Sequence, residues 1–190
     1  MTRRDSAPHA NPGCQVLTVG HSTRPIDEFI AMLAGHGVTV LIDVRTVPRS
    51  RHNPQFRGEA LGKRLAAEHI GYDHAAGLGG FRRPVPDSPN TGWRNLSFRG
   101  YADYMQTAEF GQELIGLIEL AQDECVALMC AEAVPWRCHR SLIADALIVH
   151  DVAACEIVSP TQLRTHKLTP FAHKFARAGG TWIDYPPEQP

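Results

Sequence analysis

The sequence lacks any long run of apolar residues. No stretch approaches the roughly 20 residues that a membrane-spanning helix needs, so we expect no membrane association. The N-terminus has no apolar core of the kind found in signal peptides, which argues against export. Internal repeats and low-complexity segments are also missing. With 190 residues, 43% of them hydrophobic and 21% charged, the composition is that of one globular domain.

Cysteine is scarce and odd in number, with five residues and no C-x-x-C pair. Several of these cysteines lie inside apolar runs, which favours free thiols in a reducing cytoplasm over a disulfide framework. Possible metal ligands occur at Cys130, Glu132, Cys138 and His139. Adjacent side chains such as Cys138 and His139 point in different directions on a helix, so this spacing suits a metal poorly. We therefore expect no cofactor.

The ends of the chain differ from its middle. Residues 1–13 are mostly polar with two prolines, which predicts a disordered tail. The predicted single domain covers residues 14–180, and residues 181–190 are predicted to form a loose C-terminal tail. Within the domain, the segment from Gly77 to about Gly100 shows no sustained period. A loop of that length in a compact domain is usually functional or disordered.

Short apolar runs alternate with helical patterns along the domain. Strands are predicted over residues 15–20, 38–44, 72–74, 125–130 and 155–158. Helices are predicted from residue 25 to the glycines at 35 and 37, over 59–69, from 101 through 121, around 142–147, and over 169–178. This alternation predicts an α/β domain with a mostly parallel sheet of about five strands and helices on both faces, flavodoxin-like or Rossmann-like.

Reactive side chains follow the strand that ends at Cys130. The loop after a parallel strand lies at the carboxyl edge of the sheet, where open α/β proteins bind ligands. A thiol there has the partial exposure that a nucleophile needs. The next helix N-terminus, with Arg137 or Arg140, is expected to lower its pKa. The alternative is that Cys130 is a small buried residue that fills the end of the sheet.

The neighbours of Cys130 also allow two interpretations each. Cys138 shares a helical face with Leu142 and Ala146, which favours core packing. Glu132 is either a general acid or base, or the ion-pair partner of an arginine. His139, like His21 after the first strand, either transfers protons or makes structural hydrogen bonds. The segments 77–80 and 20–22 match neither a P-loop nor a nucleophile elbow.

Positive charge is concentrated between Arg45 and Arg99. This segment contains ten basic and four acidic residues, so its net charge is +6 and that of the rest of the chain is −7. The segment is either a solvated face or a wall that binds phosphate or nucleic acid. Nine of the ten are arginines, which suit bidentate contacts with oxyanions.

Several short elements resemble the DUF488 family of domains of unknown function. They are Thr18-Val-Gly-His-Ser22, Leu41-Ile-Asp-Val-Arg45 with Pro48 and Ser50, Leu78-Gly-Gly80, Gly100-Tyr-Ala-Asp-Tyr-Met105, and Cys130-Ala-Glu132 followed by Cys138-His-Arg140. The resemblance extends from Val16 to about Phe171. It implies a compact α/β domain in a bacterial-type cytoplasmic protein and brings no established activity.

A weaker similarity is to rhodaneses and cysteine phosphatases, which end a strand in a nucleophilic cysteine and enclose an anion in a tight loop. Their loops bind the anion through backbone N–H groups and a closing arginine. Here six residues separate Cys130 from Arg137, more than in either group. The loop also holds Glu132, which repels a dianion, and Pro135, which has no N–H.

Two functional hypotheses follow. The first is a thiol-dependent enzyme acting on an anionic substrate such as a nucleotide or nucleic acid, with Cys130 as nucleophile and Glu132 as acid, base or orienting group. Its substrate contacts are expected from His21, Ser22, Arg45, Arg137, His139 and Arg140. The second is a nucleotide or nucleic-acid binding module without catalysis, which adds Trp93, Tyr101 and Tyr104 for base stacking.

Overall fold

A six-stranded sheet forms the centre of the protein, in a computed structural model that describes residues 11, 13–177 and 180–187. Its order is β3 (Gly71–His74), β2 (Val40–Asp43), β4 (Val126–Cys130), β1 (Val16–Gly20), β5 (Ala154–Ser159) and β6 (Gln162–Thr165). The first five are parallel, and only β6 pairs antiparallel, with β5. The predicted α/β class with a mostly parallel sheet is confirmed.

The strand order differs from the two topologies named above. In both the flavodoxin and the Rossmann orders, the first two strands of the chain are neighbours. Here β4 lies between β1 and β2, in register with both, so Val126 is opposite Val16 on one side and Val40 on the other. The strand that ends at Cys130 therefore occupies the middle of the sheet.

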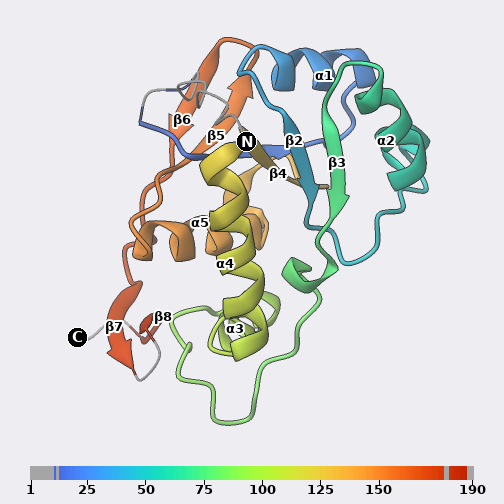
Figure 1. Cartoon of the computed structure of the whole chain (residues 1–190). Helices are drawn as coiled ribbons and strands as arrows, with labels where there is room; N and C mark the ends of the chain where they lie inside the picture. The colour runs from blue at the N-terminus through green and yellow to red at the C-terminus, as the bar shows by residue number, and fades with distance from the viewer. Residues whose placement is uncertain (1–10, 12, 178–179, 188–190) are drawn as a thin grey trace.

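Helices cover both faces of the sheet (Figure 1). Helices α1 (Ile26–Ala34) and α2 (Gly58–Ala66) pack on one face. Helices α3 (Leu96–Tyr104), α4 (Ala108–Asp123) and α5 (Arg140–Val149) pack on the other. Three short 3₁₀ turns connect these elements: η1 (Pro54–Phe56), η2 (Ala76–Leu78) and η3 (Pro135–Arg137).

The alternation of side chains along β4 decides on which face of the sheet Cys130 lies. Successive side chains of a strand point to opposite faces. Ala127 and Met129 belong to the core under α1 and α2, whereas Leu128 and Cys130 belong to the core under α3, α4 and α5. The thiol of Cys130 therefore faces the side of the sheet that carries the N-terminus of α5.

The prediction of one long helix from residue 101 is wrong. The first helix begins earlier, at Leu96, and two separate helices occupy this region. Asn95 caps α3 by accepting a hydrogen bond from the backbone N–H of Ser97 at 2.8 Å. Thr107 caps α4 by accepting one from the N–H of Phe110 at 3.3 Å. Short polar caps of this kind start helices at defined positions, and here they divide one apolar pattern into two helices.

The predicted helix over residues 169–178 is also wrong. The segment contains β7 (His173–Arg177), which pairs antiparallel with β8 (Gly180–Asp184), and Phe175 lies opposite Trp182. Figure 1 shows this hairpin near the C-terminal end of the chain, away from α1 and α2. Backbone partners from β8 replace the hydrogen bonds that a helix would make within itself. Strands β6 and β8 were not predicted.

The chain beyond residue 180 is not a loose tail as far as the structure describes it. Strand β8 starts there, and Tyr185 is fully buried and donates a hydrogen bond from its hydroxyl to Asp145 at 3.0 Å. Residues 188–190 lie outside the described residues. The same holds for most of the predicted N-terminal tail, although Asn11 is buried and donates to the carbonyl of His36.

Two cysteines depart from the expectation of free thiols. Cys14, before β1, and Cys155, in β5, form a disulfide. Cys125, Cys130 and Cys138 are free. In the described part of the chain, no helix combines the length and the apolar character that crossing a membrane requires.

Candidate active site

Three strand ends meet at the carboxyl edge of the sheet. Gly20 ends β1 opposite Cys130, and Asp43 ends β2 opposite Met129. The ladder continues past β1, because the N–H of His21 donates to the carbonyl of Cys130 at 3.0 Å. This pairing places His21, Arg45 and Cys130 at or after three strand ends at one edge of the sheet, but only Arg45 and Cys130 line the cavity there.

Gly20 lets the loop after Cys130 pass directly over the end of β1. A Cβ atom at this position would lie 1.9 Å from the carbonyl oxygen of Glu132, which is backbone and cannot move aside alone. Ser22 follows with φ of 48°, an uncommon conformation for a residue other than glycine, and its N–H donates to the carbonyl of Ala131 at 3.0 Å. These contacts fix the loop that carries Glu132 against the end of β1.

The sulfur of Cys130 has a thiol and a cation as neighbours. Its Sγ lies 2.6 Å from the Sγ of Cys138 and 3.1 Å from Nη1 of Arg140. Arg140 is fully buried, and Nη1 also donates to the carbonyls of Val19 and Glu132. Among the described residues, Nε and Nη2 of Arg140 have no hydrogen-bond partner. A buried guanidinium with so few acceptors favours an anion beside it, and the Cys130 thiolate is placed to be that anion.

The pKa values of the two thiols are shifted in opposite directions. Burial by itself raises the pKa of Cys130, but the hydrogen bond from Cys138 and the charge of Arg140 together bring it below its usual value. The pKa of Cys138 is raised well above its usual value, by the hydrogen bond to Cys130 and by burial. Of the two, Cys130 is therefore the thiol that ionises first, and Cys138 is the one that keeps its proton and can donate it in a hydrogen bond.

His139 lies beside this pair as a neutral ring. Burial lowers the pKa of His139 to about 4. Its Nε2 is 3.0 Å from the carbonyl oxygen of Val44, so Nε2 carries the proton and donates it. Nδ1 is then an acceptor, 3.6 Å from the Sγ of Cys138. Gly80 makes room for the ring, because a Cβ there would lie 2.4 Å from Nδ1.

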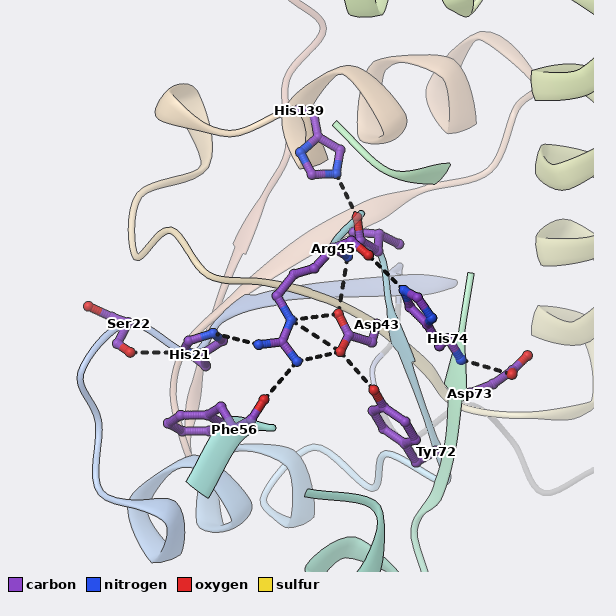
Figure 2. Close-up of polar contacts among 10 residues, drawn as sticks. His21, Ser22, Asp43, Arg45, Phe56, Tyr72, Asp73, His74 and His139 are labelled. Carbon is purple, nitrogen blue, oxygen red and sulfur yellow. Dashed lines mark hydrogen bonds and ion pairs between the residues drawn. The ribbon is translucent and has the colours of Figure 1, made fainter. Parts of the chain in front are cut away.

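Arg45 belongs to a second polar network, shown in Figure 2. Its Nε donates to Oδ1 of the fully buried Asp43 at 2.8 Å, and Nη2 donates to the carbonyl of Phe56 at 2.8 Å. Tyr72 donates to Oδ2 of Asp43 at 2.8 Å from the other side. Burial raises the pKa of the Tyr72 hydroxyl, and its hydrogen bond to Asp43 raises it further. The hydroxyl therefore stays protonated as a donor.

His21 completes this network behind Arg45. Its ring stacks on Phe56 with centroids 4.2 Å apart, and its Nδ1 lies 2.8 Å from the carbonyl oxygen of Ser22. Burial lowers the pKa of His21 to about 4, so the ring is neutral and its Nε2 accepts from Nη1 of Arg45 at 3.3 Å. His21 is 2% exposed and holds the guanidinium of Arg45 in place through this hydrogen bond.

A cavity of about 400 Å³ opens over the two thiols. Its wall includes Cys130, Cys138 and His139, and charged side chains from the two loops that follow β2 and β4. The charged residues are Arg45, Arg49, Glu132 and Arg137, and the last three are exposed. Exposed Phe81 and the half-exposed Val47 add an apolar part to the wall. Cys130 is only 2% exposed, so the partial exposure predicted for its thiol is wrong, although the residue contributes to the cavity wall. Arginines outnumber carboxylates among the charged residues of that wall.

The structure divides the predicted site residues into three groups. Cys130, Glu132, Arg45, Arg137 and His139 line the cavity. Arg140 lies behind Cys130, and His21 behind Arg45, so each contacts a lining residue instead. Neither Ser22, Trp93, Tyr101 nor Tyr104 is part of the cavity wall.

Two of the predicted stacking aromatics are placed in the core. Tyr101 is fully buried and donates from its hydroxyl to the carbonyl of Leu78 at 3.0 Å, and Tyr104 donates to Gly77 at 2.7 Å. Trp93 packs against Phe98, with centroids 4.8 Å apart, and against the core around α3. Tyr101 and Tyr104 are buried and already packed, so they cannot stack with a base and the stacking role predicted for these two is wrong in this structure. Trp93 is half-buried and lines a different hollow, so its stacking role stays a prediction.

Sequence reasoning missed the partner of Cys130. Cys138 is 4% exposed and belongs to the core cluster, as its spacing predicts, but it precedes α5 and its sulfur faces Cys130. It also missed Asp43 as the counter-ion of Arg45, although Asp43 is a lone carboxylate in an apolar run. A buried acid needs a partner, and the arginine two residues later was the signal available.

Comparison with known proteins identifies a family and adds no activity. The model of the family described as "Domain of unknown function DUF488" matches residues 25–147, about two thirds of the chain. The chain belongs to the DUF488 family. No curated protein and no solved structure matches it. The DUF488 match includes Cys130 and Arg140, and the DUF488 description assigns neither a role.

These comparisons give no support to the weaker resemblance to rhodaneses and cysteine phosphatases. The geometry also differs from their pattern. Arg140 approaches Cys130 from the buried side, fully enclosed, instead of closing a loop around an external anion. The shared feature is therefore limited to a cysteine that ends a parallel strand before a helix.

Proposed function

We propose that this DUF488 protein is a thiol-dependent enzyme in which Cys130 attacks a phosphate-bearing or other anionic substrate, such as a nucleotide or a nucleic acid. The observation that carries the proposal is the position of the Cys130 sulfur, 3.1 Å from a buried guanidinium and in the wall of the cavity. Cysteines that act as nucleophiles need both a lowered pKa and access to a substrate.

The rim of the cavity suits a negatively charged substrate. Arg49 and Arg137 are exposed and direct no ion pair to another described residue. Arg45 is instead held by Asp43, so its contribution is to the local positive charge. Arginines that are not already paired are the better candidates for contacts with substrate oxygens.

The reaction requires a proton donor for the leaving group. In this scheme the sulfur of Cys130 forms a bond to the electrophilic centre, and the leaving group departs with a proton from Glu132. Water then attacks the intermediate, Glu132 takes up a proton from that water, and the Cys130 thiolate is released. Glu132 is exposed in the cavity wall, which allows its carboxyl group to reach a substrate bound there.

Labelling with iodoacetamide tests the nucleophile. Burial raises the pKa of Cys125, whereas Arg140 and Cys138 bring that of Cys130 below its usual value, and Cys125 is the more exposed of the two. We expect Cys130 to be labelled first at pH 7, because the thiolate is the reactive form; labelling of Cys125 first would show that exposure decides the rate and would contradict the proposal. Mass spectrometry of the folded protein over a pH series separates the two outcomes.

Inorganic phosphate and a nucleotide test the substrate class. Either anion is expected to slow the labelling of Cys130 and to leave that of Cys125 unchanged. The effect should weaken in Arg49→Ala and Arg137→Ala and persist in Arg177→Ala, a control on the exposed face of β7. A Cys130 that stays unreactive until the protein unfolds rejects the enzyme proposal.

The second candidate is a nucleotide or nucleic-acid binding module without catalysis. It is favoured by a neighbouring hollow of about 570 Å³ that Arg49 shares with the exposed Arg51 and Arg57. This row of arginines extends the cationic rim beyond the cavity. Arg82, by contrast, donates to the carbonyls of Gly77 and Gly79 and is not part of the row.

Salt dependence tests this candidate, because phosphate contacts release counterions. Single-stranded DNA or RNA should bind more tightly at low ionic strength, and the double variant Arg51→Ala/Arg57→Ala should bind more weakly than Arg177→Ala. If neither nucleic acid binds at low ionic strength, the binding-module candidate is rejected.

A cytoplasmic location also stays a proposal. Disulfides are rare in reducing compartments. The proposal therefore predicts that Cys14 and Cys155 are reduced in the cell. Rapid acid quenching of cells followed by thiol alkylation measures this, and recovery of an intact Cys14–Cys155 bond in the quenched protein contradicts a cytoplasmic location.

A further inference from the structure

Cys138 forms and breaks no bond to the substrate in the reaction proposed above, yet its position is unusual for a packing residue. It lies between η3 and α5, where the chain has an extended backbone with φ of −136° and ψ of 141°. Its sulfur is in contact with three functional groups: the Cys130 thiol at 2.6 Å, the Nδ1 of His139 at 3.6 Å and the N–H of Arg140 at 3.5 Å. A residue that only fills space makes no such set of polar contacts.

The distance between the two sulfurs is close to that of a covalent bond. A disulfide requires about 2.05 Å, so the sulfurs need to approach by roughly half an ångström. Cys138 precedes α5 instead of lying within it, so this approach does not require a helix to move. The eight-residue separation between the cysteines spans the exposed loop that lines the cavity.

We propose that Cys130 and Cys138 form a redox-active pair in which Cys138 resolves the oxidised form of Cys130, with a hydroperoxide as oxidant and a dithiol as reductant. The inference rests on the proposed function only in taking Cys130 as the reactive thiol. It assigns to Cys138 a chemical role and to the cavity a second class of reactant, a small neutral peroxide.

The oxidation proceeds in two steps. The Cys130 thiolate attacks the terminal oxygen of the hydroperoxide, the O–O bond breaks, and the products are a sulfenic acid on Cys130 and an alkoxide or hydroxide that takes a proton from water. The sulfur of Cys138 then attacks the sulfur of the sulfenic acid. The S–O bond breaks, the hydroxyl leaves with the Cys138 proton as water, and the disulfide remains. A dithiol reduces it back to two thiols and becomes a disulfide itself.

The surrounding side chains suit these steps. Arg140 stabilises the thiolate that starts the reaction and lies on the buried side of Cys130, which leaves the cavity side for the peroxide. Nδ1 of His139 lies 3.6 Å from the Sγ of Cys138 and offers an acceptor for the Cys138 proton once the sulfur of Cys130 is oxidised and is no longer a thiolate. In the disulfide form Arg140 faces no thiolate. This favours reduction, because the reduced state alone satisfies the buried cation.

The test is treatment with hydrogen peroxide, followed by alkylation, tryptic digestion without reductant and mass spectrometry. Trypsin cleaves after Arg137 and Arg140, so Cys130 and Cys138 fall on different peptides, whereas Cys125 shares the peptide of Cys130. The Cys125→Ser variant removes this ambiguity and is the background for all samples. The expected product is a linked pair of peptides that have lost two hydrogen atoms, and dithiothreitol should restore both thiols.

The Cys138→Ser variant should instead accumulate a sulfenic acid on Cys130 that dimedone traps, and with more peroxide a sulfinic acid. In the linked form of the Cys125→Ser background, dimedone should find no target. Should Cys138→Ser fail to fold, as judged by circular dichroism, the linked peptides of the Cys125→Ser background decide by themselves. Oxidation of Cys130 to sulfinic acid without linkage in that background overturns the inference.

The outcomes separate this inference from the proposed function. A Cys130 that is labelled rapidly at pH 7 and protected by phosphate, but never links to Cys138, leaves the enzyme proposal standing and rejects the redox pair. Linkage by peroxide together with an absence of any anion effect on labelling supports the redox pair and rejects the anionic substrate.

Discussion

Replacing Asp43 by asparagine tests whether the network around Arg45 stabilises the carboxyl edge of the sheet. Asp43 is fully buried and Arg45 is 7% exposed, so water screens this ion pair little. Asparagine keeps the shape of the side chain but removes its charge. Arg45 then becomes a buried cation without a counter-ion, and breaking a buried pair in this way costs about 3–5 kcal/mol.

That loss is large beside the total stability of a typical domain, about 5–15 kcal/mol. Urea unfolding followed by circular dichroism is the assay, and we expect a lower midpoint at an unchanged slope. The matched control is Glu59→Gln, which breaks the Glu59–Lys63 pair, where both side chains are more than three-quarters exposed. Its midpoint should hardly move, because exposed pairs contribute little.

A double variant makes the test sharper. Asp43→Asn combined with Arg45→Met removes both charges, so it leaves no unpaired ion in the core. We expect it to be more stable than Asp43→Asn alone, which is the sign that distinguishes an unpaired charge from a lost contact. Equal midpoints for Asp43→Asn and Glu59→Gln would refute the reasoning.

Three further predictions concern single positions around the site and the helices. Burial lowers the pKa of His21 to about 4, from about 6.5 in the unfolded chain. Between these values the unfolded chain binds the proton and the folded protein does not, so the contribution of His21 to the free energy of unfolding should fall by about 3 kcal/mol as the pH drops from 6.5 to 4. The His21→Asn variant should show a correspondingly flatter pH dependence in urea unfolding, and an unchanged slope contradicts the assignment. Gly20→Ala should destabilise the protein by about 1–3 kcal/mol or more, because its Cβ would meet the carbonyl of Glu132. In Gly116→Ala, where a Cβ meets nothing within 4 Å, the thermal midpoint should stay or rise, since alanine favours a helix by up to about 1 kcal/mol. Thr107→Ala should cost about 1 kcal/mol in urea unfolding through loss of the α4 cap, and Thr107→Asn should recover most of it.

Local patterns in the sequence were sufficient for the elements that bring Cys130 to its place. The apolar run from Cys125 to Cys130 has the length of a buried strand, and β4 covers Val126–Cys130. The helical spacing from Leu142 onward corresponds to α5, which begins at Arg140. Both signals are local, because hydrophobic periodicity reports which face of a segment is buried. They placed the thiol at the end of a strand and an arginine at the start of the following helix.

Pairing between distant segments needed the tertiary structure. The insertion of β4 between β1 and β2 depends on which strand edges meet, and the apolar runs of all three strands are alike in character. The segment 173–177 becomes a strand only because β8 supplies its hydrogen-bond partners. Periodicity within one segment contains no information on its partner, so these features could not be predicted from it.

The contacts of single side chains at the site also depended on the tertiary structure. Arg45 and Arg140 looked alike in the sequence, as arginines near strand or helix ends. Folding gives Arg45 a carboxylate at 2.8 Å and gives Arg140 a thiol at 3.1 Å, so one forms a buried ion pair and the other lies beside the sulfur of Cys130. Sequence alone determined that positive charge and a thiol gather at this edge of the sheet. Only the tertiary structure determined which charge acts on the thiol, because a buried cation is defined by the acceptors that the folded chain brings within hydrogen-bond distance.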